Sequence, residues 1–424
     1  TSTVSNLSTT KISQLTTQQI NALTSAQVSA LSTTQLNNLS SSQVQSLSSG
    51  SVSALSTAQA NVLFNTSASA FSGEQLNALS TGVVSALNST QLSSLSQSQI
   101  GTLSTTQVAA LTSTQVTQLD AGKIGVLSTA QIKALRPAGV GGFNDAQIAS
   151  LSLSQIQSLT TAQANAMTST QFQKLSESQL QSMQSINVST LTSTQVNGLS
   201  EHQLWLLKPD QVNALTQDQL GALTTAQVAA IHTNSVASLV TSSLVELSTA
   251  QVQGLSTSQI AALDSNQVRA LSVTQIPALS DAQIATLNST QTRALSAAQV
   301  QALTTTQVQN LSTTFLTTLQ TSQVSQLTTT QVQTLDTTQF QSLLTTQVAA
   351  LDIAQIAALT TAQVRALSTD QLQAVTDTQM SAFDASQVQA FSTTQVTQLS
   401  TNQLLSLPDA DITALSSSQT EVLS

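Results

Sequence analysis

Apolar residues recur at every eighth position along the whole chain. The series starts with Leu7, Leu15 and Leu23 and ends with Leu423, and all 53 of its positions are apolar. A second apolar residue, usually Val, Ile or Leu, follows five positions after nearly every member. No insertion or deletion interrupts this register, which is the signature of a repeat protein. The members of the series other than Leu are Phe71, Phe143, Met167, Met183, Ile231, Val375, Phe383 and Phe391.

The polar positions of the repeat predict the start of a helix. Ser, Thr, Asp or Asn follows the Leu in 44 of 53 octads, and Gln comes three residues later in 41 of 53. In one typical octad, Ser104 is placed to cap a helix and Gln107 to complete a capping box. Leu103 and Val108 have the spacing of a hydrophobic staple. We therefore expect one short helix per octad, starting at positions 8, 16, 24 and onward.

Two other structures are possible for an eight-residue period. In one continuous α-helix, eight residues overshoot two turns by about 80°, so the apolar stripe would wind around the surface. A β-solenoid suits the Val and Thr content. However, the apolar positions alternate at intervals of three and five residues, which would place them on opposite faces of a strand. The predicted fold is an all-α solenoid of very short capped helices, and the β-solenoid remains the alternative.

The number of helices in one turn of the solenoid is suggested by rare cap residues. A six-residue helix is not stable alone, so stability must come from stacking of neighbouring repeats. Most Asp and Asn caps lie at multiples of 24, which predicts three helices per turn. These caps are Asp120, Asn144, Asp264, Asn288, Asp336 and Asp384, whereas Asn88 and Asp352 lie elsewhere.

The unbroken register predicts one continuous domain, residues 1–424, with 53 repeats. Pro137 and Pro209 fall at the first helical position, where proline is tolerated. Pro277, inside its helix, and Pro408, at a cap position, predict local irregularity. The glycine-rich octad 136–143 is either a binding loop or hinge, or an imperfect copy of the repeat, which we favour.

Composition argues against several classes of function. Charged residues make up 6% of the chain and there are only nine Lys and Arg, so a cationic surface for nucleic acid is not expected. The chain has no Cys and only two His, His202 and His232, which lie in different octads. Abundant Ser and Thr need a nearby base to act as nucleophiles. We therefore expect no enzyme activity, no catalytic or metal-binding residues, no cofactor and no membrane-spanning helix.

One short segment carries unusual surface residues. Trp205 occupies an outward position beside Leu206 and Lys208, and it is the only Trp of the chain. An exposed Trp beside Leu can mark a contact surface, so Trp205, Leu206 and Lys208 form a candidate contact patch. The equally weighted alternative is that Trp205 packs against a neighbouring coil.

The repeat unit resembles the short repeats of large bacterial secreted and surface proteins. The likeness extends over the whole chain, through motifs such as Leu367-Ser368-Thr369-Asp370-Gln371-Leu372. The families with such repeats include adhesin-like, surface-layer and filament-forming proteins. The resemblance implies an extracellular, structural role at a bacterial cell surface.

The leading functional hypothesis is a rod, surface fibre or filament subunit built by stacking of octapeptide repeats. The chain starts at Thr1, which suggests a processed product or a part of a longer polypeptide. The last repeats look like interior ones, so we expect copies to associate head to tail or laterally. The alternative hypothesis is an α-solenoid binding scaffold or adhesin stalk that presents a regular surface to a partner, such as a cell-surface component.

Overall fold

The computed structural model describes residues 2–423, and all the regular secondary structure in that range is helical. Over these residues it contains 51 short α-helices and two 3₁₀ helices. No strand occurs among the described residues, so the all-α prediction is confirmed and the β-solenoid alternative is wrong. All α-helices have four to six residues except α8, Thr57–Ser67, which has eleven.

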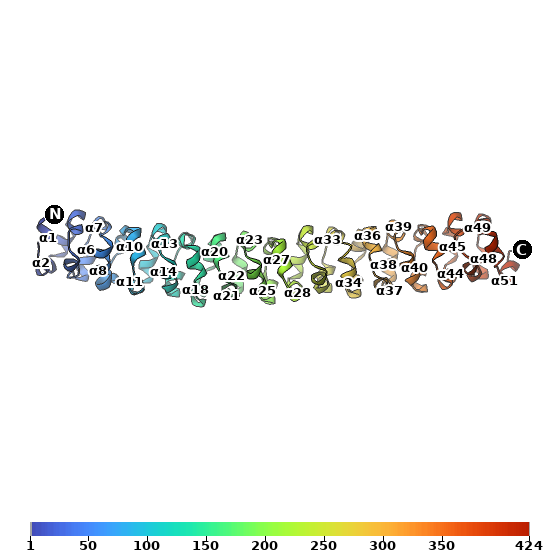
Figure 1. Cartoon of the computed structure of the whole chain (residues 1–424), viewed down its shortest axis with the longest axis horizontal. Coiled ribbons are helices and arrows are strands. Elements are labelled where there is room, and N and C mark those ends of the chain that lie inside the picture. Colours follow the sequence, from blue (N-terminus) through green and yellow to red (C-terminus); the bar gives the residue numbers. More distant parts are fainter. Residues whose placement is uncertain (1, 424) are drawn as a thin grey trace. The chain divides into compact units, whose positions relative to one another are not determined.

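The chain forms two compact units, one up to Ala222 and one from Leu223 onward. Figure 1 shows the short helices of each unit following one another as turns of a coil. The single continuous domain stays a prediction of the octad register.

The bounds of the helices follow the octads closely in both units. In the first unit they are α1 (Ser2–Ser5), α2 (Thr9–Ser13), α3 (Thr17–Asn21), α4 (Ser25–Ser29), α5 (Thr33–Leu36), α6 (Ser41–Ser46), α7 (Ser49–Ser53), α8 (Thr57–Ser67), η1 (Ala68–Ala70), α9 (Gly73–Ala78), α10 (Thr81–Ala86), α11 (Ser89–Ser94), α12 (Gln97–Gly101), α13 (Thr105–Ala110), α14 (Ser113–Gln118), α15 (Ala121–Gly125), α16 (Thr129–Ala134), α17 (Pro137–Gly141), α18 (Asp145–Ser150), α19 (Leu153–Ser158), α20 (Thr161–Ala166), α21 (Ser169–Gln173), α22 (Glu177–Ser182), α23 (Ser185–Ser189), α24 (Ser193–Asn197), α25 (Glu201–Leu206), α26 (Pro209–Asn213) and α27 (Gln217–Ala222). In the second unit they are α28 (Thr225–Ala230), α29 (Thr233–Ala237), α30 (Thr241–Val245), α31 (Thr249–Gly254), α32 (Thr257–Ala261), α33 (Ser265–Ala270), η2 (Ile276–Ala278), α34 (Asp281–Ala285), α35 (Ser289–Ala294), α36 (Ala297–Gln301), α37 (Thr305–Gln309), α38 (Thr313–Thr318), α39 (Thr321–Val324), α40 (Thr329–Thr334), α41 (Thr337–Gln341), α42 (Thr345–Val348), α43 (Ile353–Ala357), α44 (Thr361–Ala366), α45 (Thr369–Ala374), α46 (Asp377–Met380), α47 (Ala385–Ala390), α48 (Thr393–Thr397), α49 (Thr401–Ser406), α50 (Asp409–Ile412) and α51 (Ser417–Glu421).

The helix starts lie at the predicted caps. Ahead of α13, Ser104 has an extended backbone and its hydroxyl accepts a hydrogen bond from the N–H of Gln107 at 3.2 Å. The Gln107 side chain in turn accepts from the N–H of Ser104 at 2.9 Å. The same reciprocal pair, the capping box, recurs at most octads in both units because the sequence repeats the residues that form it.

The two apolar positions of each octad form the core. Val108 is fully buried and Leu111 is 1% exposed, and the equivalent residues of other octads are similarly covered. The predicted staple therefore supplies the packing that a helix of six residues cannot supply for itself.

Each helix packs against the third helix that follows it. Within the first unit, α13 contacts α16, α16 contacts α19, and α19 contacts α22. Hydrogen bonds between turns join residues 25 to 31 positions apart, as from Ser25 to Gly50 and from Gln147 to Val116. One turn therefore takes slightly more than three helices, close to the predicted number.

The prolines behave as their positions predict. Pro137 and Pro209 each begin a regular helix at its first position. Around Pro277 the α-helix is replaced by the short 3₁₀ helix η2. Pro408 stands where a cap is expected and provides no side-chain hydrogen bond to α50.

The glycine-rich octad 136–143 forms the regular helix α17, as an imperfect copy of the repeat. It packs closely against α20. A methyl group at Gly141 would overlap the backbone carbonyl oxygen of Ala166 on α20. Glycine is thus needed here for the close approach of two backbones.

Candidate functional site

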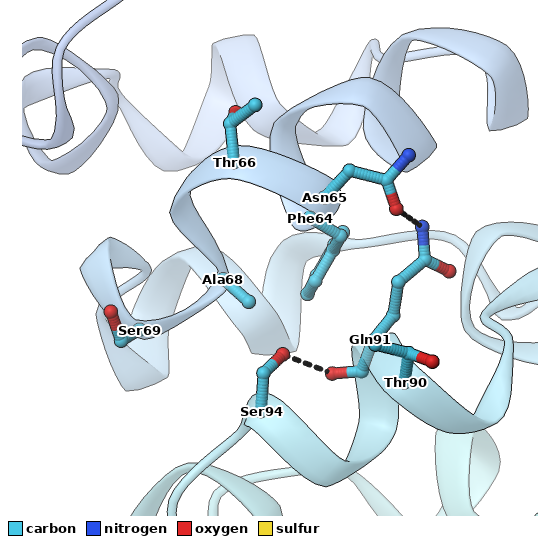
Figure 2. Close-up of a pocket in the computed structure, with 8 residues that line it drawn as sticks. All are labelled: Phe64, Asn65, Thr66, Ala68, Ser69, Thr90, Gln91 and Ser94. Atoms are coloured by element: carbon cyan, nitrogen blue, oxygen red, sulfur yellow. Dashed lines mark hydrogen bonds between the residues drawn. The ribbon is translucent and has the colours of Figure 1, made fainter.

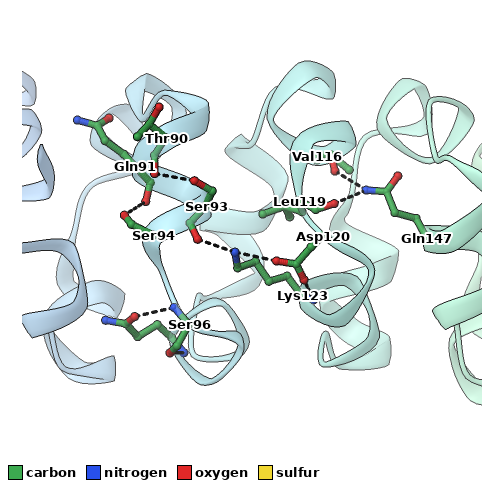
Figure 3. Close-up of polar contacts among 11 residues, drawn as sticks. Thr90, Gln91, Ser93, Ser94, Ser96, Val116, Leu119, Asp120, Lys123 and Gln147 are labelled. Atoms are coloured by element: carbon green, nitrogen blue, oxygen red, sulfur yellow. Dashed lines mark hydrogen bonds and ion pairs between the residues drawn. The ribbon is translucent and has the colours of Figure 1, made fainter.

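The most distinctive chemical feature of the molecule is the contact that the repeated glutamine makes between turns. Gln147, which is fully buried, accepts a hydrogen bond from the N–H of its own cap, Asn144, at 2.9 Å. Its side-chain nitrogen donates to the carbonyl oxygens of Leu119 at 2.8 Å and Val116 at 3.1 Å, in the preceding turn (Figure 3). One amide group therefore caps its own helix and joins that helix to the turn before it.

The same arrangement recurs through both units, and we call it the glutamine ladder. In most octads the nitrogen of the ladder glutamine donates to carbonyls 28 and 31 residues earlier, as Gln147 does. In the second unit, Gln363 donates to Leu335 at 2.8 Å and to Val332 at 2.7 Å. Gln363 is 1% exposed, so these hydrogen bonds are made away from water. Buried polar groups must be paired, and the ladder pairs the carbonyls at the ends of the short helices.

The ladder explains the choice of Gln over Glu. A capping box accepts either residue, because both have an oxygen that can reach the N–H of the cap. Only an amide also has N–H groups, so Glu in its ionised form could not donate to the preceding turn. In this sequence Gln occupies the position in 41 octads and Glu in none.

Some polar residues that replace the ladder glutamine keep a donor to the preceding turn. Ser51 donates from its hydroxyl to Leu23 at 2.9 Å. Asn187 donates from its amide to Leu159 at 2.9 Å, but its side-chain oxygen is buried without a partner. Because Asn is one methylene shorter than Gln, it reaches the preceding turn and not the N–H of its cap.

Lys123 fills a ladder position with a charged donor. Its ammonium group donates to the carbonyl oxygen of Ser93 at 2.8 Å and forms an ion pair with Asp120, its own cap, at 2.8 Å (Figure 3). The Lys123 side chain is only 7% exposed. The hydrogen bond from Lys123 holds the pKa of Asp120 below its ordinary value, against the smaller opposing effect of desolvation. Asp at this cap therefore neutralises a cation that replaces Gln.

The clearest break in the repeat lies at Phe64, which stands at a cap position. Helix α8 continues through this junction and is followed by η1. Phe64 is buried and stacks on Phe71 with ring centroids 4.6 Å apart. The ladder glutamine Gln91 adapts by donating to the side chain of Asn65 at 2.9 Å (Figure 2).

This break leaves an open pocket of about 230 Å³ beside α8. Thr90, Gln91 and Ser94 of α11 line it, opposite Phe64 and Asn65 of α8 (Figure 2). The pocket has no ionisable side chain in its lining, so it offers no acid, base or nucleophile pair for catalysis.

The structure separates the residues of the candidate contact patch. Trp205 is 50% exposed and Lys208 is exposed, but Leu206 is only 7% exposed. Leu206 occupies the last position of α25, which is partly covered in many octads, so a large apolar side chain there turns inward. Leu206 thus cannot contribute to a surface, and a contact role for Trp205 and Lys208 stays a prediction.

The two histidines have local roles. His202 lies 3.1 Å from the carboxylate of Glu177 in the preceding turn, and its ring stacks on Trp205. His232 acts as a cap, with its Nδ1 accepting the N–H of Asn234 at 3.1 Å. Over residues 2–423, no three His, Asp or Glu residues come together in a group that could hold a metal ion.

The sequence predicts one of the two roles of the ladder glutamine and not the other. The capping role follows from the three-residue spacing, but the donation to the preceding turn does not. The available signal was the strict preference for Gln where Gln and Glu would cap equally well.

No helix within the described range is both long and apolar enough to span a bilayer.

Comparison with known protein families finds the ALTTAQ repeat. It matches residues 4–33, 124–161, 228–265, 236–273, 260–295, 276–313 and 348–385, which together span somewhat less than half of the chain. Residues 358–363 spell the motif Ala-Leu-Thr-Thr-Ala-Gln, which contains the core Leu, the cap and the ladder glutamine. No curated protein matches the chain. The matches and the coiled helical units show that this is a repeat protein with regular helical repeats, similar in sequence to the ALTTAQ repeat.

Proposed function

We propose that this protein is a structural element of the bacterial cell exterior, serving as a rod, surface fibre or filament subunit. In this role it has no enzymatic activity, and its main partner is a second copy of itself. The observation that supports the proposal best is the glutamine ladder.

The ladder makes the two faces of each turn different and complementary. One face offers side-chain amide donors, as Gln147 does, and the other offers carbonyl acceptors, as Val116 and Leu119 do. A contact between unlike complementary faces is heterologous, and such contacts form open assemblies when they do not close into a ring. Stacking of turns from separate copies would repeat the hydrogen bonds and apolar contacts found inside each unit.

The outer surface suits a passive structural element. Outward positions are mostly Ser, Thr, Gln, Asn and Ala, and the net charge is −9 over 424 residues. The resemblance of the repeat unit to repeats of bacterial surface proteins supports a location outside the cell. We accordingly place the protein at the cell surface or in the extracellular space.

Electron microscopy of the purified 424-residue chain tests the assembly. We expect uniform fibres with an axial repeat of about 8–10 Å, the spacing of packed helices. Isolated particles at all concentrations would contradict the proposal of a self-assembling filament.

A pair of variants tests whether apolar stacking drives this association. Near the C-terminal end of the chain, Ile412 is 38% exposed although it occupies a core position. Ile412→Glu combined with Leu415→Lys should abolish fibres by placing charges on the stacking face. The control is Thr413→Lys with Ser418→Glu, which introduces the same charges at exposed positions. Fibres that survive the first pair would show that the contacts are lateral instead.

The second candidate function is a binding scaffold or adhesin stalk. The exposed ring of Trp205, in a chain with only 2% aromatic residues, is the observation that favours it. A monomeric chain that binds a cell-surface component through the Trp205 region would support this function over the filament.

A further inference from the structure

An open groove of about 510 Å³ crosses successive turns of the first unit. Leu153 and Gln157 of α19 line it at one side, and Gln181 and Gln184 line it around the junction of α22 and α23. Lys208, the residue before α26, completes it together with Asp210. The groove therefore runs along the coil and could accommodate an extended ligand of several units.

The lining of the groove is rich in uncharged groups that can donate and accept hydrogen bonds. Gln157 and Gln184 are exposed, and the structure gives their side chains no hydrogen bond within residues 2–423. Asp210 accepts a hydrogen bond from Ser185 at 2.7 Å through one oxygen. Lys208 and Asp210 carry opposite charges, so the groove has little net charge and suits a neutral ligand.

The exposed aromatic ring lies in line with this groove. Gln157, Gln181 and Trp205 occupy the same octad position on α19, α22 and α25, and these helices pack one on the next. Gln181 also donates to the carbonyl oxygen of Leu206 at 3.0 Å, which joins the groove lining to the end of α25. His202 stacks on the ring of Trp205 and is itself held by Glu177, so the ring is supported on one side.

We propose that the groove and Trp205 form a binding site for a neutral, β-linked oligosaccharide. A flat sugar ring has an apolar C–H face that can lie on an exposed indole and a rim of hydroxyl groups that pair with amides. Phosphate or nucleic-acid ligands are disfavoured because the groove has one cation, balanced by Asp210. The site is independent of self-assembly, so it goes beyond the structural role proposed above.

The intrinsic fluorescence of the protein provides a direct assay. Trp205 is the only Trp and the chain has no Tyr, so the emission reports this position alone. Cellohexaose and chitohexaose are the probes, added to the full-length chain. We expect a saturable blue shift of the emission for at least one of them, because a stacked sugar removes water from the indole.

Variants identify the residues that bind. Isothermal titration calorimetry should show that binding is lost in Trp205→Ala. In the double variant Gln157→Ala with Gln184→Ala, the affinity should be weakened about tenfold, which is the effect of losing one or two hydrogen bonds. All three residues are exposed or half exposed, and circular dichroism checks that the fold is kept. Gln253→Ala is the matched control, because Gln253 is an exposed amide in the second unit at the same octad position as Gln157.

Three results would overturn the proposal. The first is no saturable change with either oligosaccharide, the second is binding that persists in Trp205→Ala, and the third is an equal loss of affinity in Gln253→Ala. Binding that depends on Trp205 and on the groove amides, and is unchanged in the control, would establish the site.

Discussion

Replacing one ladder glutamine by glutamate separates its two roles. If Gln147 served only as part of a capping box, Gln147→Glu would be neutral or slightly stabilising, because Glu caps equally well and its charge suits a helix N-terminus. The ladder predicts the opposite sign. A carboxylate keeps the hydrogen bond from Asn144 but loses those to Leu119 and Val116, and brings a negative charge up to their carbonyl oxygens.

The size of the effect follows from the protonation equilibrium. In its protonated form the introduced carboxyl group can still donate one hydrogen bond, so the cost at low pH is about 1 kcal/mol for the one that is lost. At pH 7, protonating a carboxyl group with an ordinary pKa of about 4.3 costs about 3.7 kcal/mol. The additional loss of stability at pH 7 therefore cannot exceed this value. We therefore expect Gln147→Glu to lower the free energy of unfolding by about 3–5 kcal/mol at pH 7 and by about 1 kcal/mol near pH 4.

The sign of the pH dependence is fixed by the same reasoning. Burial and facing carbonyls raise the pKa of the introduced carboxyl above its unfolded value. The native state then binds more protons than the unfolded state, so stability falls as pH rises from the unfolded pKa toward the folded one.

The assay compares Gln147→Glu with Gln157→Glu, the same change at an exposed position. Hydrogen exchange of the segments that contain the two contacting turns, measured by mass spectrometry at pH 4 and pH 7, reports local opening. We expect faster exchange around residues 116–119 and 144–148 in Gln147→Glu at pH 7 after correction for intrinsic rates. Equal protection in the two variants at pH 7, or an equal loss at both pH values, would refute the ladder.

Other predictions address the ion pair, the close approach and the core. Asp120→Ala should lower the free energy of unfolding by more than the ~1 kcal/mol of a lost cap, because it leaves Lys123 buried without its ion-pair partner. Adding Lys123→Gln to this variant should recover part of the lost stability, measured by urea denaturation. The pKa of Asp120 is lowered on folding, so the stability that Asp120 contributes should be fully present above its ordinary pKa of 3.8. This stability should be lost as the pH falls through the pKa of Asp120 in the folded state. Acid unfolding of the protein, compared with that of the Asp120→Ala variant, measures the loss. Gly141→Ala should destabilise by about 1–3 kcal/mol in thermal unfolding, since its methyl group would overlap a backbone carbonyl. Leu111→Ala should cost roughly 2–5 kcal/mol and Thr112→Ala about 1 kcal/mol, and the reverse order in denaturation would contradict the assignment of core and cap.

The helix starts could be predicted from the sequence because they depend on local chemistry. A cap such as Ser104 and its partner Gln107 are three residues apart, so the spacing alone determines whether their hydrogen bonds can form. The burial of Leu111 and Val108 follows from the same octad, because a short helix has only one apolar side to cover.

Contacts between turns could be predicted only in part. The 24-residue spacing of Asp and Asn caps indicates three helices per turn, but the hydrogen bonds join residues 25 to 31 apart. This offset depends on how far each turn slides along the one before it, which no local rule determines. The second role of Gln147 and the burial of Leu206 both depend on that offset, so neither was predicted.

The departures from the repeat also include features that depend on residues close in sequence and features that depend on contacts between turns. The spacing of the caps indicates Asp120 only as a marker of the turn, whereas its partner Lys123 is three residues away and explains its presence. The lack of a polar cap at Phe64 does not by itself predict that α8 continues, because α30 and α42 begin as separate helices after Val240 and Leu344.

The buried glutamine side chains join successive turns of the solenoid. The most direct test is nuclear magnetic resonance of the chain labelled with ¹⁵N only at glutamine, following exchange of the side-chain N–H₂ protons with solvent. We expect two populations: ladder glutamines such as Gln147 and Gln363 protected from exchange, and exposed ones such as Gln157 and Gln253 exchanging freely. Exchange of all glutamine side chains at the rate of the free amide would show that the ladder does not exist.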